Sequence, residues 1–205
     1  MISRRSFVRT ALAYPFLSYA PSAWGAGNIQ KVSGAVYVND QRISPSAEIR
    51  AGDSIVVSHD GELEFVLGED AYRLGPRSVL TLERAGGGAV SALRLLTGAI
   101  LGVFGRRHQR LPVHTAFATI GIRGTGVFVS TTPSQLYTCT CYGTTDLLAG
   151  AHNEVFSATH HNAHIVDRHG DGTMTVKASS MQGHDDEQLR RLEAYVGRRP
   201  LFDHT

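Results

Sequence analysis

The sequence predicts an all-β fold of stacked antiparallel sheets, followed by a short C-terminal helix. Runs of alternating apolar and polar residues extend from about residue 28 onwards, and clusters of Gly, Asn and Asp separate them. That arrangement is typical of a sandwich, a barrel or a solenoid-like stack. The choice between a sandwich and a solenoid-like stack stays open, because no strict repeat is visible. At 205 residues, the chain is long enough for one domain with a hydrophobic core.

Residues 1–26 resemble an export signal of the twin-arginine type. Arg4 and Arg5 are adjacent and precede a modestly apolar stretch at residues 11–20, which small residues follow. The apolar stretch is too short to span a bilayer stably. We therefore expect cleavage near Ala26, a periplasmic mature protein and no transmembrane helix in the mature chain. An ordinary general-secretion signal is the alternative.

The expected charge of the mature chain is close to neutral. Removing Arg4, Arg5 and Arg9 from the 20 basic residues leaves 17 against 18 acidic ones, so the net charge becomes −1. Nucleic-acid-binding domains usually carry a pronounced basic patch or stripe. We therefore expect no nucleic-acid partner.

Residues 27–150 form the main predicted β domain. Apolar residues occupy every second position at 32–38 and again at 63–67, as in strands with one buried face. Residues 90–111 are predicted to form a longer apolar pair of strands, hinged near Gly98 and Gly102. Clusters of turn-forming residues between these segments set the strand boundaries.

The stretch from Ile120 to Val129 is the most distinctive part of this domain. Two apolar strand segments flank a bend that contains Arg123, Gly124 and Thr125. Glycine within a strand pattern usually marks a bulge, a bend or a close backbone approach. Because an unpaired buried charge is costly, we expect the Arg123 guanidinium to be buried and to satisfy the carbonyl groups of the bend. Ligand binding by Arg123 is the alternative.

Arg-Gly-Thr between two apolar strands resembles the core motif of the FecR domain, the periplasmic module of iron-transport sensor proteins. The resemblance covers about residues 28–150, in which further segments follow the family's order. These segments are Gly34–Val38, Ile49–Asp53, Leu63–Leu67, Leu74–Leu82 and Leu95–Gly98. The resemblance implies a signalling or binding module whose partner is a cell-envelope protein or an envelope component. Full sensors have a cytoplasmic segment and a membrane helix before this domain. Neither is recognisable here, so direct control of a sigma factor is not implied.

Residues 151–205 are expected to form a β-hairpin extension and the C-terminal helix. Residues 136–142 and a segment starting at 146–148 are predicted as two separate strands, and residues 154–166 as a third. The sequence His-Gly-Asp-Gly at 169–172 predicts a tight hairpin turn.

The C-terminal helix is predicted from its capping residues and its periodicity. Asp185 is suited to the N-cap, with Gln188 in the capping-box position. Leu189 and Leu192 fall on one face, which we expect to pack on the β body. Gly197 is placed to end the helix.

Two cysteines and several histidines form the candidate site. Cys139 and Cys141 lie two residues apart in a predicted strand, so both thiols project from the same face. His160, His161 and His164 follow within reach of a hairpin. Thiolate and imidazole groups suit soft metal ions, so zinc or copper are the candidate cofactors. A disulfide or redox-active pair, and unpaired structural thiols, are the alternatives.

The sequence contains no hydrolase nucleophile motif, phosphate-binding loop or dinucleotide fingerprint. We therefore expect no enzyme and no catalytic residues. The main functional hypothesis is a non-enzymatic, exported FecR-like module of the cell envelope. The alternative hypothesis is a periplasmic protein that binds metal or is redox-active through its cysteines and histidines.

Overall fold

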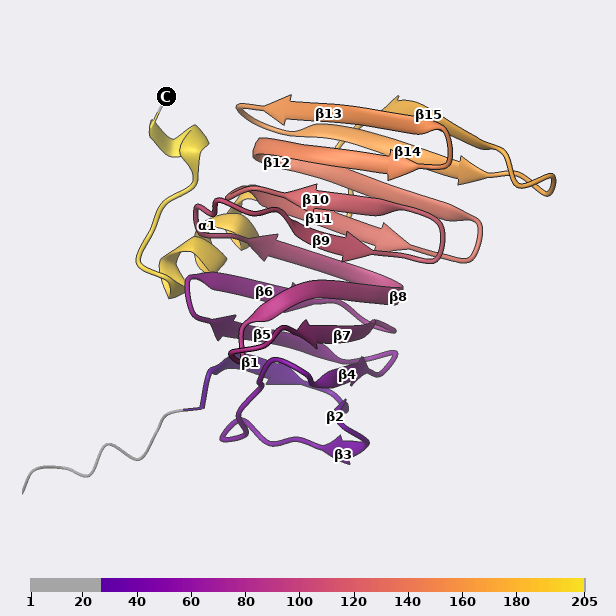
Figure 1. Ribbon diagram of the computed structural model, residues 1–205. Coiled ribbons are helices and arrows are strands. Elements are labelled where there is room, and N and C mark those ends of the chain that lie inside the picture. Colours follow the sequence, from indigo (N-terminus) through magenta and orange to yellow (C-terminus); the bar gives the residue numbers. More distant parts are fainter. Residues whose placement is uncertain (1–26, 205) are drawn as a thin grey trace, which may run out of the picture.

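The computed structural model describes residues 27–204, and the chain is β-rich with one α-helix near its end (Figure 1). The predicted export signal, with Arg4 and Arg5, lies outside the described residues. The elements are β1 Ile29–Ser33, β2 Val36–Val38, β3 Gln41–Arg42, β4 Ser54–Val57, β5 Glu62–Leu67, β6 Asp70–Leu74, β7 Val79–Arg84, β8 Val90–Val103, β9 Leu111–His114, β10 Thr119–Ile122, β11 Gly126–Thr131, β12 Gln135–Ala149, β13 His152–Ala158, β14 Asn162–Arg168, β15 Met174–Ser179, α1 Asp186–Tyr195 and the 3₁₀ helix η1 Leu201–His204.

The strands join into one hydrogen-bonded network, which is antiparallel except for the pairing of β8 with β9. Figure 1 shows them stacked from β3 at one end to β13, β14 and β15 at the other. The all-β prediction is confirmed. Of the finer architecture, the pairing establishes a barrel-like sheet with additional strands, and it selects neither the sandwich nor the solenoid-like stack that the sequence left open.

The two longest strands, β8 and β12, connect the two halves of this network. β8 pairs with β7 up to Thr97 and with β11 from Gly98 onwards. Likewise β12 pairs with β11 up to Tyr142 and with β13 from Gly143 onwards. Both glycines have positive φ, +85° and +84°. A Cβ on Gly98 would lie 2.4 Å from the Ser78 Cα, so each long strand changes partners at a glycine that its surroundings require.

Strand β12 separates two hydrophobic cores and is buried on both faces. Leu136 points into the larger core, which most of the strands share. Cys139 and Cys141 point into the smaller core, which Leu189 and Leu192 of α1 cover. The alternation of side chains along a strand therefore decides which residues of β12 face the helix.

Helix α1 begins and ends where the sequence predicts. The Asp185 carboxylate accepts a hydrogen bond from the Gln188 backbone N–H at 2.8 Å, and Gly197 has φ +70° just beyond the helix. Leu189 and Leu192 are fully buried, as expected. Gln188 Oε1 has no partner among the described residues, so the reciprocal arm of the capping box is missing.

The strand boundaries after residue 135 differ from the prediction. Residues 136–142 and 146–148 belong to the single strand β12, and residues 154–166 form two strands, β13 and β14. The turn between these two strands contains His161, whose φ is +51°. The expected boundary at residue 150 lies in the turn between β12 and β13, and strands on both sides of it join the same sheet.

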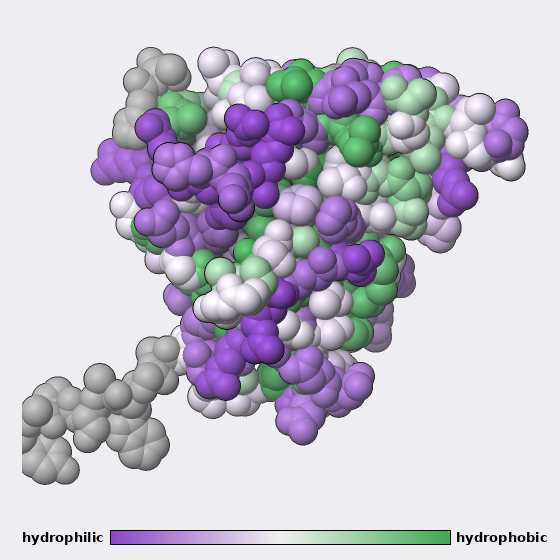
Figure 2. All heavy atoms as spheres, in the orientation of Figure 1, coloured by the Kyte–Doolittle hydropathy of each residue, from purple (hydrophilic) through white to green (hydrophobic). Residues whose placement is uncertain are grey.

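The visible face is a mosaic in which hydrophilic residues surround smaller hydrophobic patches (Figure 2). Within residues 27–204, no helix combines the length and the apolar character that crossing a membrane requires.

Candidate functional site

The Arg-Gly-Thr bend differs from the prediction at its arginine. Arg123 is exposed, and its guanidinium has no hydrogen bond or ion pair with any described residue, so it does not satisfy the carbonyl groups of the bend. Gly124, by contrast, has φ +70°, and a Cβ there would lie 2.9 Å from the Arg106 Cα. Thr125 is fully buried. The bend therefore depends on the close backbone approach at Gly124 and on the burial of Thr125. The charge of Arg123 lies at the surface, where solvent can hydrate it.

Cys139 and Cys141 lie on one face of β12, as the two-residue spacing predicts. Both are 0% exposed, and both thiols are reduced and free. Cys139 is paired across the sheet with Phe128 on β11 and with Ala163 on β14. Strands β11 and β14 thus flank β12 at the cysteines, and α1 covers the core into which the two sulfurs point.

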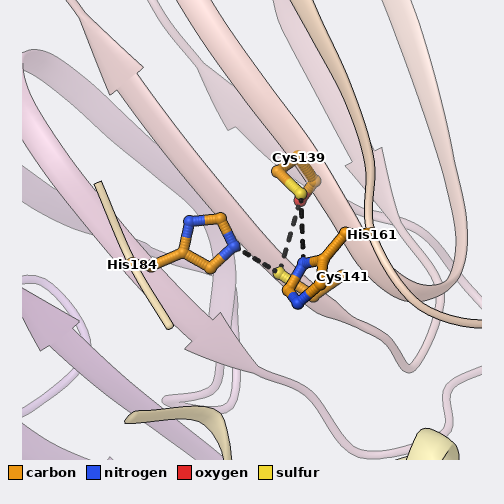
Figure 3. A group of neighbouring side chains, drawn as sticks. All are labelled: Cys139, Cys141, His161 and His184. Atoms are coloured by element: carbon orange, nitrogen blue, oxygen red, sulfur yellow. Dashed lines mark hydrogen bonds between the residues drawn. The ribbon is translucent and has the colours of Figure 1, made fainter. Parts of the chain in front are cut away.

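Two histidines from different segments meet these sulfurs (Figure 3). The Nδ1 atom of His161, in the β13–β14 turn, lies 3.5 Å from Cys139 Sγ. The Nε2 atom of His184, in the segment that leads to α1, lies 3.3 Å from Cys141 Sγ. His161 is a predicted ligand, whereas His184 was not predicted from the sequence. Only its place one residue before the helix N-cap marks His184 in the sequence, and nothing there relates it to Cys141.

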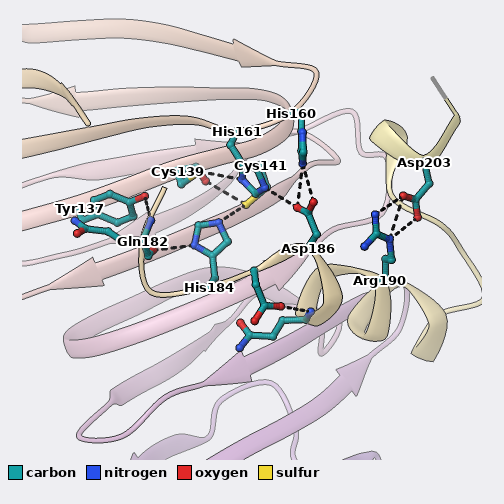
Figure 4. A network of polar contacts seen from close by, with 12 residues as sticks. Tyr137, Cys139, Cys141, His160, His161, Gln182, His184, Asp186, Arg190 and Asp203 are labelled. Atoms are coloured by element: carbon teal, nitrogen blue, oxygen red, sulfur yellow. Dashed lines mark hydrogen bonds and ion pairs between the residues drawn. The ribbon is translucent and has the colours of Figure 1, made fainter. Parts of the chain in front are cut away.

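The ring nitrogen that points away from the sulfurs also has a partner in each histidine (Figure 4). His161 Nε2 lies 2.8 Å from the Asp186 carboxylate in the first turn of α1. His184 Nδ1 lies 3.0 Å from the backbone carbonyl of Gln182. The Phe128 ring stacks on His184 with centroids 4.6 Å apart. Both rings are therefore held in fixed orientations.

The other two predicted histidines do not join the sulfurs. His160 is half exposed, and its Nε2 atom lies 3.0 Å from both oxygens of Asp186. His164 pairs with Thr138 on the opposite face of the sheet and stacks on Phe156 at 3.8 Å. The prediction of His164 as a ligand was therefore wrong, because the turn at His161 interrupts the strand on which the face assignment relied.

Burial and hydrogen bonding shift the pKa values within the cluster. The hydrogen bond from Cys141 lowers the pKa of Cys139, and contacts with His161 and His184 add to the effect. Burial raises the pKa of the Cys141 thiol well above its usual range. Burial opposes protonation of His161, but its hydrogen bonds with Cys139 and Asp186 raise its pKa overall. The cluster therefore favours a thiolate at Cys139 beside a protonated His161.

Two kinds of chemistry use a thiolate, an imidazole and a carboxylate. One is nucleophilic catalysis, in which a histidine activates the cysteine. The other is metal binding, in which thiolates and imidazoles are ligands and the carboxylate orients a histidine. A nucleophile has to meet its substrate, yet both sulfurs are fully buried. The geometry therefore favours a metal ion over a substrate.

No protein-family profile matches the sequence, and no curated protein matches it significantly. The fold is similar to two solved structures of a "putative anti-sigma factor" from Parabacteroides distasonis ATCC 8503. Their TM-scores are 0.52 and 0.53, with 14% sequence identity in both cases. The similarity covers 62% of this chain and 60% of the matched chains, so less than two thirds of those proteins is represented here. At this identity, the likeness concerns the fold alone.

Proposed function

We propose that this chain is a non-enzymatic signalling or binding module of the cell envelope, related in kind to FecR-type sensor modules. The single observation that carries the proposal is the fold, which resembles structures described as those of a "putative anti-sigma factor". The order of the strand segments and the Arg-Gly-Thr bend support the FecR resemblance at the sequence level. The partner is then a protein or another component of the envelope.

The proposed location is the periplasm, reached through the twin-arginine signal at residues 1–26. Arg4 and Arg5 support this part of the proposal. Proteins exported by this route fold before they cross the membrane, which suits a chain whose two long strands and C-terminal helix depend on distant contacts.

Transcript profiling of a strain that lacks this chain, compared with its parent, tests the proposed role. We expect a defined set of envelope-related transcripts to change and the full-length chain to restore them. A chain without residues 1–26 is the matched control and should not restore them. Restoration by the cytoplasmic version would contradict an envelope location, and unchanged transcripts would contradict the signalling role.

A further inference from the structure

Four side chains with soft donor atoms converge in the smaller core. One donor atom each from Cys139, Cys141, His161 and His184 lies within 4.8 Å of the other three. The geometry points to a closed Zn²⁺ site formed by these four residues, which fastens the start of α1 to the β body. This inference is independent of the proposed envelope function, because a zinc site would be compatible with any partner.

The distances between the donor atoms suit a tetrahedral ion. Zinc bonds of about 2.3 Å to sulfur and about 2.0–2.1 Å to nitrogen place neighbouring sulfur and nitrogen ligands about 3.6 Å apart. The observed separations are 3.5 Å between Cys139 Sγ and His161 Nδ1, and 3.3 Å between Cys141 Sγ and His184 Nε2. These two pairs already have the spacing of zinc ligands, and all four donor atoms lie within 4.8 Å of one another, so side-chain movements could close the site around an ion.

The groups around the cluster are those that orient histidine ligands. A metal-bound histidine usually donates its other ring N–H to a carboxylate or a backbone carbonyl. Asp186 plays that part for His161, and the Gln182 carbonyl does so for His184. These contacts leave His161 Nδ1 and His184 Nε2, the two atoms nearest the sulfurs, as the ligating nitrogens.

The charge of the site also favours a divalent soft ion. On binding, the ligands release to solvent the protons that the cysteines and histidines still carry, and two thiolates with Zn²⁺ give a neutral centre. Neutrality matters because both sulfurs are fully buried, where a net charge is costly. A Cu⁺ ion would leave one negative charge, and Mg²⁺ and Ca²⁺ prefer oxygen ligands. With four protein ligands the site has no open position, which is typical of structural rather than catalytic zinc.

The ligands come from three segments that the fold brings together (Figure 4). Cys139 and Cys141 belong to β12, His161 to the β13–β14 turn, and His184 to the segment between β15 and α1. In that last segment the Gln182 backbone N–H donates to Tyr137 Oη at 3.0 Å. Zinc would add a coordinate bond at His184. It would also fix His161, whose Nε2 atom contacts Asp186, the first residue of α1. Metal occupancy would thus determine how firmly the helix is attached.

Metal titration of the full-length or naturally processed chain, purified without a polyhistidine tag and stripped by a chelator under reducing conditions, tests the site directly. We expect one Zn²⁺ per chain. Co²⁺ should produce the sulfur-to-metal charge-transfer band and the intense visible bands of a tetrahedral thiolate site. Zinc removal should accelerate amide hydrogen exchange across residues 180–190. Failure of the wild-type chain to bind stoichiometric zinc, or a cobalt spectrum without thiolate bands, would overturn the inference.

Variants from separate segments identify the ligands. Cys141→Ser and His184→Gln should each abolish stoichiometric zinc, and Asp186→Asn should weaken binding by about 10–100-fold. His160→Gln and His164→Gln are matched controls that should retain full stoichiometry. His160, His161 and Asp186 form a second, more exposed group. Zinc lost in His160→Gln but kept in His184→Gln, with both variants folded by circular dichroism, would place the ion in that outer group and refute the proposed ligand set.

Discussion

The two ends of helix α1 are attached to the β body by different chemistry. Near its C-terminal end, the fully buried Glu64 carboxylate on β5 accepts hydrogen bonds from Arg191 at 2.8 Å and from the Tyr195 hydroxyl at 2.7 Å. At its N-terminal end, Asp186 contacts His160 and His161, and His161 faces a buried sulfur. One end is attached by charged side chains, and the other by imidazoles beside thiols.

A second buried carboxylate strengthens the C-terminal attachment. Glu193 is 3% exposed and accepts hydrogen bonds from the Tyr142 hydroxyl on β12 and from Arg198 Nε, the latter at 2.6 Å. Burial and the neighbouring charge of Glu193 raise the pKa of Tyr142 above its ordinary value. Glu193 follows Leu189 by four residues and therefore lies on the same buried face of the helix, where these two partners satisfy its carboxylate.

The difference between the two ends lies in whether the chain alone completes the interactions. Glu64 and Glu193 each have an arginine and a tyrosine from this chain, so the charges are balanced at the C-terminal end. At the N-terminal end, two imidazole nitrogens and two sulfurs point at one another, and the proposed zinc ion would bind all four. We infer that the C-terminal attachment is permanent and that the N-terminal attachment depends on the ion.

The largest expected effect comes from removing the arginine partner of Glu64. Arg191→Met leaves the Glu64 carboxylate buried with Arg73 at 3.9 Å as the nearest remaining cation. We expect the free energy of unfolding to fall by about 3–5 kcal/mol, as when one partner of a buried ion pair is deleted. Chemical denaturation measures this. Arg190→Met, one position away and paired with Asp203 at the surface, is the matched control and should have little effect. Equal losses of unfolding free energy in the two variants would show that the buried ion pair contributes no more than the surface pair.

A smaller effect, with a defined pH dependence, is expected at Tyr195. Burial and the hydrogen bond to Glu64 raise the pKa of Tyr195 to about 12, from an ordinary value of 10. Tyr195→Phe should lower the free energy of unfolding by about 1–2 kcal/mol at neutral pH. The lost hydrogen bond is to a charged carboxylate, which strengthens it, but Tyr195 is partly exposed, which weakens it. A raised folded-state pKa stabilises the fold fully below pH 10 and loses that contribution as the pH rises towards 12.

The stability difference between the wild type and Tyr195→Phe should therefore be constant below pH 10 and shrink between pH 10 and 12. Urea denaturation of both proteins across this range tests the expectation. Tyr137, whose pKa burial also raises to about 12, is present in both proteins and cancels. A difference that stayed constant up to pH 12 would mean that Tyr195 does not titrate against Glu64.

At the N-terminal end, the cap contributes less. Asp185→Ala removes the acceptor of the Gln188 N–H and should cost about 1 kcal/mol, whereas Asp185→Asn keeps an acceptor and should cost less. Measurements on Asp185→Ala with and without zinc test whether the ion holds this end of the helix. We expect hydrogen exchange at the first turn of α1 to increase mainly in the zinc-free form. An identical increase in both forms would argue against an ion-dependent attachment.

The smallest effect is expected for Arg123→Ala in the Arg-Gly-Thr bend. Because Arg123 is exposed, the melting temperature should be unchanged within error. Gly124→Ala is the contrasting variant, since φ +70° and the nearby Arg106 backbone leave no room for a methyl group. It should lower the melting temperature clearly. A large loss with Arg123→Ala would restore the hypothesis of a guanidinium that supports the bend.

The local features of this protein can be predicted from its amino-acid sequence. Alternation of apolar residues predicts the strands, because side chains on a strand point to opposite faces with a period of two. The same rule places Cys139 and Cys141 on one face, and capping chemistry places α1 between Asp185 and Gly197. These features depend on neighbouring residues only, so the sequence contains all the information they need.

Features that depend on distant segments could not be predicted in this way. The turn at His161 reversed the expected face of His164, since a single interruption shifts every later side chain. His184 follows Cys141 by 43 residues, and the two side chains meet only because α1 docks on the smaller core. Glu193 lies on the buried helix face with Leu189, and the hydrogen bonds that satisfy its carboxylate come from Tyr142 on β12 and from Arg198. Such contacts depend on how distant elements pack against one another, which the local periodicity of the sequence does not predict.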